Sequence, residues 1–446
     1  MNILIKDINI VNEYKITKAN ILVENDIIKI ISEKKINVSD NNHIIIDGNG
    51  KYAFPGIIDE HVHFREPGLT HKADIYTESR AAVAGGVTSV MDMPNVNPQT
   101  VTIKDLNNKI KIAEKKSFTN FSFYLGVTNN NIDEIKNINP KTVCGIKLFM
   151  GSSTGNMLID DIDYLNTVFK ESPTLIATHC EDEEIIIKNT AKYKEIFGND
   201  IPFNYHPKIR TAEACYKSSA LAVKLAEKHN SRLHILHLTS EKEIQLFKNN
   251  IKTKDKQITA EVCVNHLWFD EHDFDKLGSK IKCNPAIKSE TDKTALLQAL
   301  KNNYIDTIAT DHAPHLFNEK QNSYFKAPSG IPIIQHSLLM MLEFYHQNKI
   351  SLEQIVDKMC HKPAEIFNID KRGFLKENNF ADITIIDIND KTTVTKDTIL
   401  YKCKWSPLEN YSFSSKITHT IINGNLVYEN GKFNEQFKGK ALTFNR

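Results

Sequence analysis

The chain has 446 residues, of which 41% are hydrophobic and 25% charged, and its formal net charge at pH 7 is +1. This composition is typical of globular proteins and allows a large core. Because neither acidic nor basic residues are in excess, it favours neither nucleic acid nor an anionic membrane surface as a partner. The first residues lack the apolar run of a signal peptide, and no apolar stretch reaches about 18 residues, so we expect a soluble, cytoplasmic protein.

The seven cysteines are scattered along the chain and never form a C-x-x-C pair. This spacing argues against a disulfide framework or a zinc ribbon and fits a reducing compartment. Cys180 adjoins a candidate metal ligand, but we expect it to be a small buried strand residue rather than a nucleophile.

Both ends of the chain predict β-structure. They contain β-branched runs broken by Asn-Asp and Asp-Gly turn signals, and no helical period is visible there. The expected strands are 3–5, 21–23, 27–31, 44–46, 382–387 and 418–428. We predict one small β-sandwich domain assembled from residues 1–55 and 375–446; two independent β appendages are the alternative.

The middle of the chain, residues 56–374, alternates strand and helix patterns. Apolar runs of strand length occur at 57–63, 87–93, 121–127, 143–150, 174–179, 232–238, 258–264 and 306–310. Segments of helix-forming composition lie between them, at 72–84, 182–197, 211–229, 241–250 and 290–302, and a further helix is expected at 351–367. Eight strand-helix units predict an α/β fold, a TIM-like (β/α)8 barrel, with a doubly wound open sheet as the alternative.

Residues able to bind metal ions stand at the ends of several predicted strands. His61 and His63 are two positions apart, so they point to the same side of an extended strand, and Arg65 continues that side. Further along the chain come Lys147, His179, His237 and Asp311. The carboxyl ends of barrel strands meet at one mouth, where active sites are built, so we expect these side chains to converge.

Side-chain alternation separates two further histidines from this set. His234 and His237 lie on one predicted strand but differ in parity, so we assign only His237 to the barrel interior. His312, of opposite parity to Asp311, is expected to have a structural role.

Three motifs carry a resemblance to a known family. The segment 59–68, the Met-Pro-Asn of 93–95 and the Thr-Asp-His-Ala-Pro-His of 310–315 resemble the dihydroorotases, in the cyclic amidohydrolase branch of the amidohydrolase superfamily. The resemblance spans nearly the whole chain. It implies a site with two Zn²⁺ ions, bridged by a carboxylated Lys147 and a hydroxide. In that site His61 and His63 hold one ion, His179 and His237 hold the other, and Asp311 completes the first.

Ligand chemistry agrees with this assignment. Imidazoles and carboxylates suit zinc, whereas the ammonium of Lys147 has no lone pair to offer and would need to be carboxylated. An ordinary lysine facing a substrate anion is the alternative for Lys147.

The resemblance also implies an activity and a substrate. Dihydroorotases reversibly hydrolyse the cyclic amide of dihydroorotate to N-carbamoyl-L-aspartate, and the ring-closing direction serves pyrimidine biosynthesis. Asp311 would take the proton of the attacking hydroxide and pass it to the leaving nitrogen. A guanidinium such as Arg65 suits the substrate carboxylate. The resemblance places Asn95 and His315 around the same carboxylate and Asn284 around the ring, although a salt bridge for Arg65 and turn roles for the asparagines are the alternatives.

The sequence leaves the role of Glu60 and the structure of the segment 314–330 open. Glu60 stands where the family usually has an apolar residue, and its parity is opposite to that of the two histidines. The segment 314–330 shows no clear period and is either a lid over the barrel mouth or a long solvated loop.

Hydantoinases and allantoinases use similar metal residues on related rings, and Arg65 is the residue that distinguishes the dihydroorotase pattern. A catalytically dead homologue that supports aspartate transcarbamoylase would be expected to lack ligands, and all six are present here. By analogy with the family we expect a small-molecule substrate and a homodimer, with association with aspartate transcarbamoylase as a further possibility.

Overall fold

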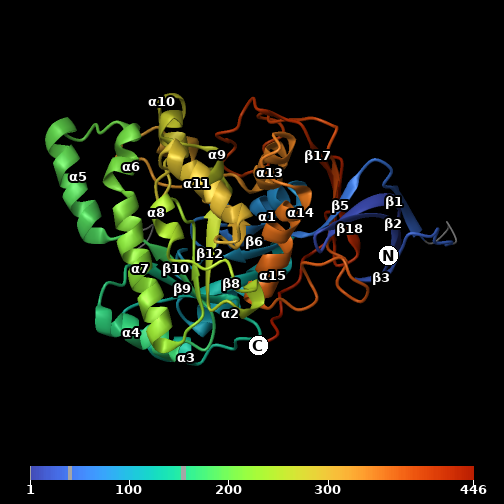
Figure 1. Ribbon diagram of the computed structural model, residues 1–446, viewed down its shortest axis with the longest axis horizontal. Coiled ribbons are helices and arrows are strands. Elements are labelled where there is room, and N and C mark those ends of the chain that lie inside the picture. The colour runs from blue at the N-terminus through green and yellow to red at the C-terminus, as the bar shows by residue number, and fades with distance from the viewer. Residues whose placement is uncertain (1, 39–42, 152–156) are drawn as a thin grey trace.

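A parallel β-barrel forms the centre of the molecule (Figure 1). The computed structural model describes residues 2–38, 43–151 and 157–446. Within these residues, eight barrel strands pair in chain order. They are β6 (Ile57–Val62), β7 (Val87–Asp92), β8 (Asn120–Gly126), β9 (Gly145–Met150), β10 (Ile176–Cys180), β11 (Leu233–Ile235), β12 (Ile258–Cys263) and β13 (Thr307–Ala309). A parallel bridge between Val62 and His312 joins the last strand to the first, which confirms the predicted barrel.

Helices cover the outside of the barrel (Figure 1). They are α1 (Ile75–Ala84), α2 (Ile103–Lys116), α3 (Ile132–Lys136), α4 (Ile162–Glu171), α5 (Glu183–Phe197), α6 (His206–Ile209), α7 (Ala212–His229), α8 (Glu241–Ile244), α9 (Val264–Trp268), α10 (Phe274–Leu277), α11 (Glu290–Lys301), α12 (Phe317–Lys320), α13 (Ser337–His346), α14 (Leu352–Val356) and α15 (Lys362–Phe367). Side-chain caps fix several starts: Asp182 accepts from the Ile185 amide at the start of α5, and Thr211 accepts from the Ala214 amide at the start of α7.

Two predicted helices differ in detail. The helix expected at 241–250 ends at Ile244, because the next amides, of Leu246 and Phe247, bond three residues back to Glu243 and Ile244. The helix expected at 351–367 is one run in which a π-helical segment, Asp357–His361, joins α14 to α15.

The two ends of the chain share one sheet, so the interpretation as two independent appendages is wrong. Among the described residues this sheet has nine strands, and β5 pairs with both β1 and β14. The members are β1 (Asn2–Asn12), β2 (Lys15–Glu24), β3 (Ile27–Ser32), β4 (His43–Asp47), β5 (Tyr52–Pro55), β14 (Ile383–Asp387), β17 (Lys416–Ile422), β18 (Asn425–Glu429) and β19 (Lys432–Phe433). A separate pair joins β15 (Thr392–Thr393) to β16 (Ser412–Phe413).

The last residues of the chain leave this sheet and contact the barrel, as the position of the C-terminus in Figure 1 shows. Leu442 and Phe444 pack with barrel residues such as Ile58 and Met91. Arg446 donates hydrogen bonds to the carbonyl oxygens of Val143 and Cys144. The C-terminal tail is therefore part of the barrel's packing.

All seven cysteines are buried thiols without disulfide partners, as expected from their spacing. Burial raises the pKa of Cys180 to about 11, so this residue is a poor nucleophile. In the described part of the chain, no helix is both long enough and apolar enough to cross a membrane.

Candidate active site

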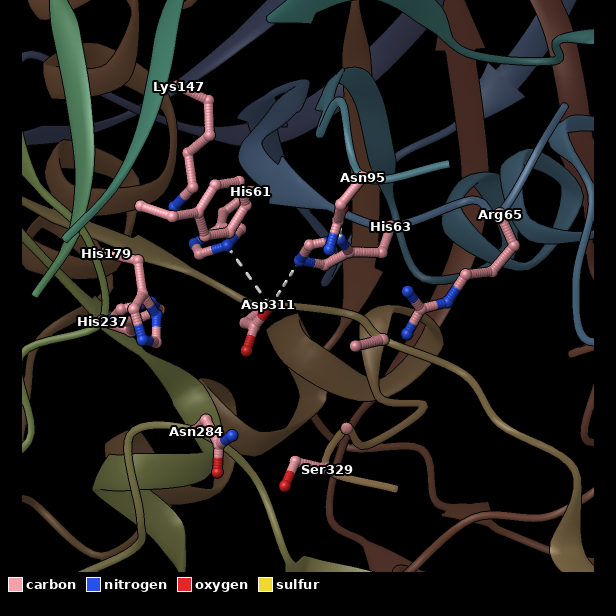
Figure 2. A pocket seen from close by; sticks show the side chains of 13 residues that line it. His61, His63, Arg65, Asn95, Lys147, His179, His237, Asn284, Asp311 and Ser329 are labelled. Carbon is pink, nitrogen blue, oxygen red and sulfur yellow. Dashed lines mark hydrogen bonds and ion pairs between the residues drawn. The ribbon is translucent and has the colours of Figure 1, made fainter. Parts of the chain in front are cut away.

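The carboxyl ends of the barrel strands surround one pocket, which is shown in Figure 2. All the site residues predicted from the sequence line it except His315, which lies behind Arg65. The lining residues are His61, His63, Arg65, Asn95, Lys147, Phe149, His179, His237, Asn284, Asp311, Ala313, Ser329 and Gly330.

Three of these side chains direct their atoms at one point. Oδ1 of Asp311 lies 2.9 Å from Nε2 of His63 and 3.3 Å from Nε2 of His61. The Nδ1 atom of His63 lies 2.8 Å from Oδ1 of Asn95, and the Nδ1 atom of His61 lies 2.8 Å from Oε1 of Glu261. Since those oxygens accept hydrogen bonds, each imidazole carries its proton on Nδ1 and turns a lone pair toward Asp311.

Electrostatics keep the His63 ring neutral and the Asp311 carboxylate charged. Burial lowers the pKa of His63 to about 4, despite the neighbouring Asp311 carboxylate. Burial acts to raise the pKa of Asp311, but the two histidines hold it far below its usual range. Three electron-pair donors therefore face one another at close range, an arrangement that a divalent cation between them would stabilise.

A second group lies on the other side of the pocket (Figure 2). Nδ1 of His179 is 3.0 Å from Nε2 of His237, and Nε2 of His179 is 3.1 Å from Oε2 of Glu181. Arg210 pairs with the same Glu181 carboxylate, and together with His179 it keeps the Glu181 pKa near 2, against the effect of burial. Glu181 is thus an anion that favours a proton on His179 Nε2, which leaves Nδ1 free for a metal ion.

Lys147 lines the pocket between these two groups and is almost fully buried. Burial lowers the pKa of its amine to about 8. An uncharged amine is the form that reacts with carbon dioxide, so this environment fits the carboxylated lysine that the resemblance implies. The donor set of the pocket, four imidazoles and a carboxylate beside this amine, fits divalent ions such as zinc.

The parity argument that separated His234 from His237 is wrong. The ring of His237 lines the pocket beside the rings of His61 and His179, while Nε2 of His234 lies 3.9 Å from Oε2 of Glu261. Both histidine rings therefore lie inside the barrel, because β11 ends at Ile235 and the positive φ of His237 (42°) breaks the alternation. Glu60 lies within the same group, 4.0 Å from Nε2 of His234, since the pairing of β6 shifts register after Asp59.

His312 has the structural role expected for it. Nε2 of its ring lies 2.8 Å from Oε2 of Glu78, and its Nδ1 accepts from the backbone N–H of Ile333.

A cationic group forms the remaining wall. Arg65 is 2% exposed, its Nε donates to Pro314 O, and its Nη2 lies 3.1 Å from Nε2 of His315. On the other side of the His315 ring, Nδ1 lies 3.1 Å from the Lys72 ammonium. Burial and the cation of Arg65 hold the pKa of His315 well below its usual range, so the ring stays neutral between two cations.

This wall is suited to an anion. Within the described residues no carboxylate comes within 4 Å of the Arg65 guanidinium, although Lys72 pairs with Glu319 at 3.1 Å. Burying an unpaired guanidinium costs free energy, which a bound carboxylate would recover.

Three residues of the site were missed by the sequence reasoning. Glu261 offered a signal, since it is a carboxylate inside the apolar run 258–264. Glu181 and Lys72 stand in polar segments that resemble ordinary surface, and no sequence signal distinguishes them.

Comparisons with known proteins found a matching family model and several similar proteins. The model of the amidohydrolase family matches residues 52–427. A protein of Bacillus subtilis named dihydroorotase is 33% identical, over 97% of this chain and 99% of its own length. A dihydroorotase of Methanosphaera stadtmanae is 31% identical over 92% of this chain and 93% of its own. Among solved structures, the L-hydantoinase (dihydropyrimidinase) of Arthrobacter aurescens superposes with a TM-score of 0.92 at 26% identity, covering 99% of both chains.

Proposed function

Because the chain belongs to the amidohydrolase family, we propose that it is a dihydroorotase, which opens the ring of dihydroorotate to N-carbamoyl-L-aspartate and closes it in pyrimidine biosynthesis. One observation carries the choice of substrate. Arg65, buried and without a carboxylate partner among the described residues, lines the same pocket as the histidines and Asp311. Dihydroorotate supplies a carboxylate beside its cyclic amide, and this is the anion that the cationic wall lacks.

The metal-binding part of the proposal rests on the donors described above. His61, His63 and Asp311 would hold one zinc ion, and His179 and His237 a second, with carboxylated Lys147 between them. Two such ions would lower the pKa of a bound water and polarise a substrate carbonyl.

Asp311 then moves the proton. Its carboxylate lines the pocket and is charged at neutral pH, so it would be placed to accept a proton from the attacking water. As the oxygen–carbon bond forms and the carbon–nitrogen bond breaks, Asp311 delivers this proton to the ring nitrogen. Arg65 holds the substrate carboxylate and orients the ring. Asn284 lines the wall of the pocket that faces the ring.

The test is the loss of dihydroorotate, followed by absorbance, with purified zinc-loaded protein beside hydantoin and allantoin. Turnover of dihydroorotate well above that of the other rings is expected. No turnover with both metal sites loaded would contradict the proposal.

A hydantoinase or dihydropyrimidinase is the second candidate, favoured by the likeness to the Arthrobacter enzyme. Hydantoin and dihydrouracil carry no carboxylate, so this activity would leave Arg65 buried and unpaired. Preference for those rings in the same assay would select this candidate.

Arg65→Met is expected to raise the KM for dihydroorotate roughly 10²- to 10³-fold, because the substrate carboxylate loses its charge-assisted partner. Arg65→Lys, the matched control, keeps the charge but loses the bidentate fork and is expected to show a smaller increase. Steady-state kinetics on both variants provide the measurement. An unchanged KM in Arg65→Met would show that the carboxylate binds elsewhere.

Gly330→Ala is expected to weaken substrate binding by about tenfold or more. Gly330 has φ +145°, and a Cβ there would overlap the carbonyl oxygen of Ala313 and would lie 2.9 Å from Cδ2 of His315. The backbone of the loop and the His315 ring would therefore have to shift. Gly198→Ala is the control, since Gly198 also has a positive φ (+65°) but no atom within 4 Å of such a Cβ. Equal KM values for the two variants would contradict this expectation.

A further inference from the structure

Two lysines outside the metal and anion groups bind the backbone of the segment 314–330, here called the β13 loop. The ammonium of Lys320, fully buried, donates to three carbonyl oxygens, those of Lys282 at 3.0 Å, Pro328 at 2.9 Å and Gly330 at 3.0 Å. These are all the donors that an ammonium has. The ammonium of Lys282 donates to the carbonyl oxygens of Tyr324 at 2.6 Å and Ala327 at 2.7 Å.

Neither ammonium is neutralised by an acid. In residues 2–38, 43–151 and 157–446, no carboxylate lies within 4 Å of Lys282 or Lys320. Burial lowers the pKa of Lys320 to about 7 and that of Lys282 to about 8. Buried charges without a counter-charge destabilise a fold, and an apolar side chain would cost less. Stability alone therefore does not explain the pair.

The bonds reach the substrate side of the pocket. Pro328 and Gly330, both held by Lys320, flank Ser329, whose carbonyl oxygen lies 3.1 Å from Nε2 of His315. Because His315 stands beside Arg65, the position of Ser329 determines where the cationic wall lies. Ser329 and Gly330 themselves line the pocket, and Figure 2 shows Ser329 on the same side as Asn284.

The middle of the loop is tied to Asn284 through His206. The Tyr324 hydroxyl lies 2.8 Å from Nδ1 of His206, and Nε2 of His206 lies 2.8 Å from Cys283 O and 3.2 Å from Oδ1 of Asn284. In addition, the N–H of Gly330 donates to Lys282 O at 2.9 Å. One network of buried donors thus fixes both the β13 loop and the segment 282–284.

We propose that Lys320 and Lys282 are positioning residues that hold the β13 loop as a preformed wall of the carboxylate site, rather than leaving it to act as a moving lid. The proposal rests on the proposed function for its substrate. The loop is predicted to stay closed whether or not a substrate is bound, and the two ammonium groups contribute to binding without touching the reacting atoms.

The test compares Lys320→Met with Lys358→Met in the full-length, metal-loaded protein. Lys358 is the matched control: its buried ammonium also donates to backbone, to Ile305 O at 2.8 Å, but next to the start of β13, at the far end of the barrel from the pocket. Lys320→Met is expected to raise the KM for dihydroorotate about tenfold with kcat within about twofold, because three buried carbonyls lose their donor. Amide hydrogen exchange across 323–331 is expected to accelerate, while metal content stays the same.

Two results would overturn the proposal: exchange across 323–331 in Lys320→Met as slow as in the parent, or the same changes in Lys358→Met. If Lys320→Met fails to fold, Lys282→Met takes its place, since it removes only the two bonds to Tyr324 O and Ala327 O. The same two measurements, KM and amide exchange across 323–331, then decide. If the parent does not turn over dihydroorotate, the proposed function fails, and the exchange comparison still decides the role of the lysines.

Discussion

Asp311→Asn is expected to lower kcat/KM for dihydroorotate by roughly 10²- to 10⁴-fold in a protein that remains folded. The Asp311 carboxylate lies 2.9 Å from Nε2 of His63, and the neighbouring histidines hold its pKa far below the usual range. The Asp311 carboxylate is therefore charged throughout the neutral pH range. Asparagine has nearly the same shape but carries no charge and cannot take up a proton. The variant should therefore lose activity while it remains folded.

Measuring the bound zinc separates the two roles assigned to Asp311, metal ligation and proton transfer. If Asp311→Asn retains its zinc and loses turnover, the proton-transfer role accounts for the effect; if zinc is lost too, ligation contributes. Asp270→Asn is the control, because Asp270 pairs with Lys293 away from the pocket. Activity of Asp311→Asn within about tenfold of the parent would rule out the acid/base role.

The barrel could be predicted from the sequence because its strands are buried on both faces. Such strands appear as continuous apolar runs, and each of the eight runs corresponds to a strand of the barrel. The helices expected at 72–84, 182–197, 211–229 and 290–302 were also recoverable from composition. The helix expected at 241–250 ends early, at α8, where three-residue backbone bonds replace the last turns, and α2, α4 and α13 were not among the expected segments.

Alternation along a strand was the part of the reasoning that failed. It holds only where the backbone stays regular, and the site is built where strands end or slip. β11 ends two residues before His237, and β6 shifts register between Asp59 and Val62. Parity counted from His237, or from His61 and His63, therefore misplaces His234 and Glu60, which both lie inside the barrel. Arg65, His237 and Asp311 all have a positive φ, which is uncommon for such residues and concentrates at functional sites.

Contacts between distant segments were beyond the sequence. Lys282 and Lys320 resemble surface lysines in a chain that has many, and nothing local signals that both ammonium groups are buried against backbone carbonyls. Their role depends on two segments 38 positions apart in the sequence coming together at the barrel mouth. The sequence motifs identify the side chains that take part in the reaction. They do not identify residues, such as Lys282 and Lys320, that position the wall of the pocket.

Lys147→Ala is expected to lower activity on dihydroorotate by on the order of 10³-fold or more, with loss of bound zinc. In the proposed site the carboxylated amine would be the one protein ligand common to both ions, so its removal would leave only the two histidine pairs and Asp311 to hold them. The surroundings of Lys147 favour the uncharged amine, which is the form that can be carboxylated. Lys147 is 1% exposed, and burial lowers its pKa to about 8.

Added short carboxylic acids should restore part of the zinc and part of the turnover of Lys147→Ala, because acetate or propionate can enter the space left by the side chain and supply a bridging carboxylate. Lys358→Met, which removes a buried ammonium at the far end of the barrel, should neither lose zinc nor respond to the acids. Rescue confined to the Lys147 variant would identify the missing group as a carboxylate rather than a cation. Unchanged zinc content in Lys147→Ala would instead make Lys147 an ordinary lysine that faces the substrate anion.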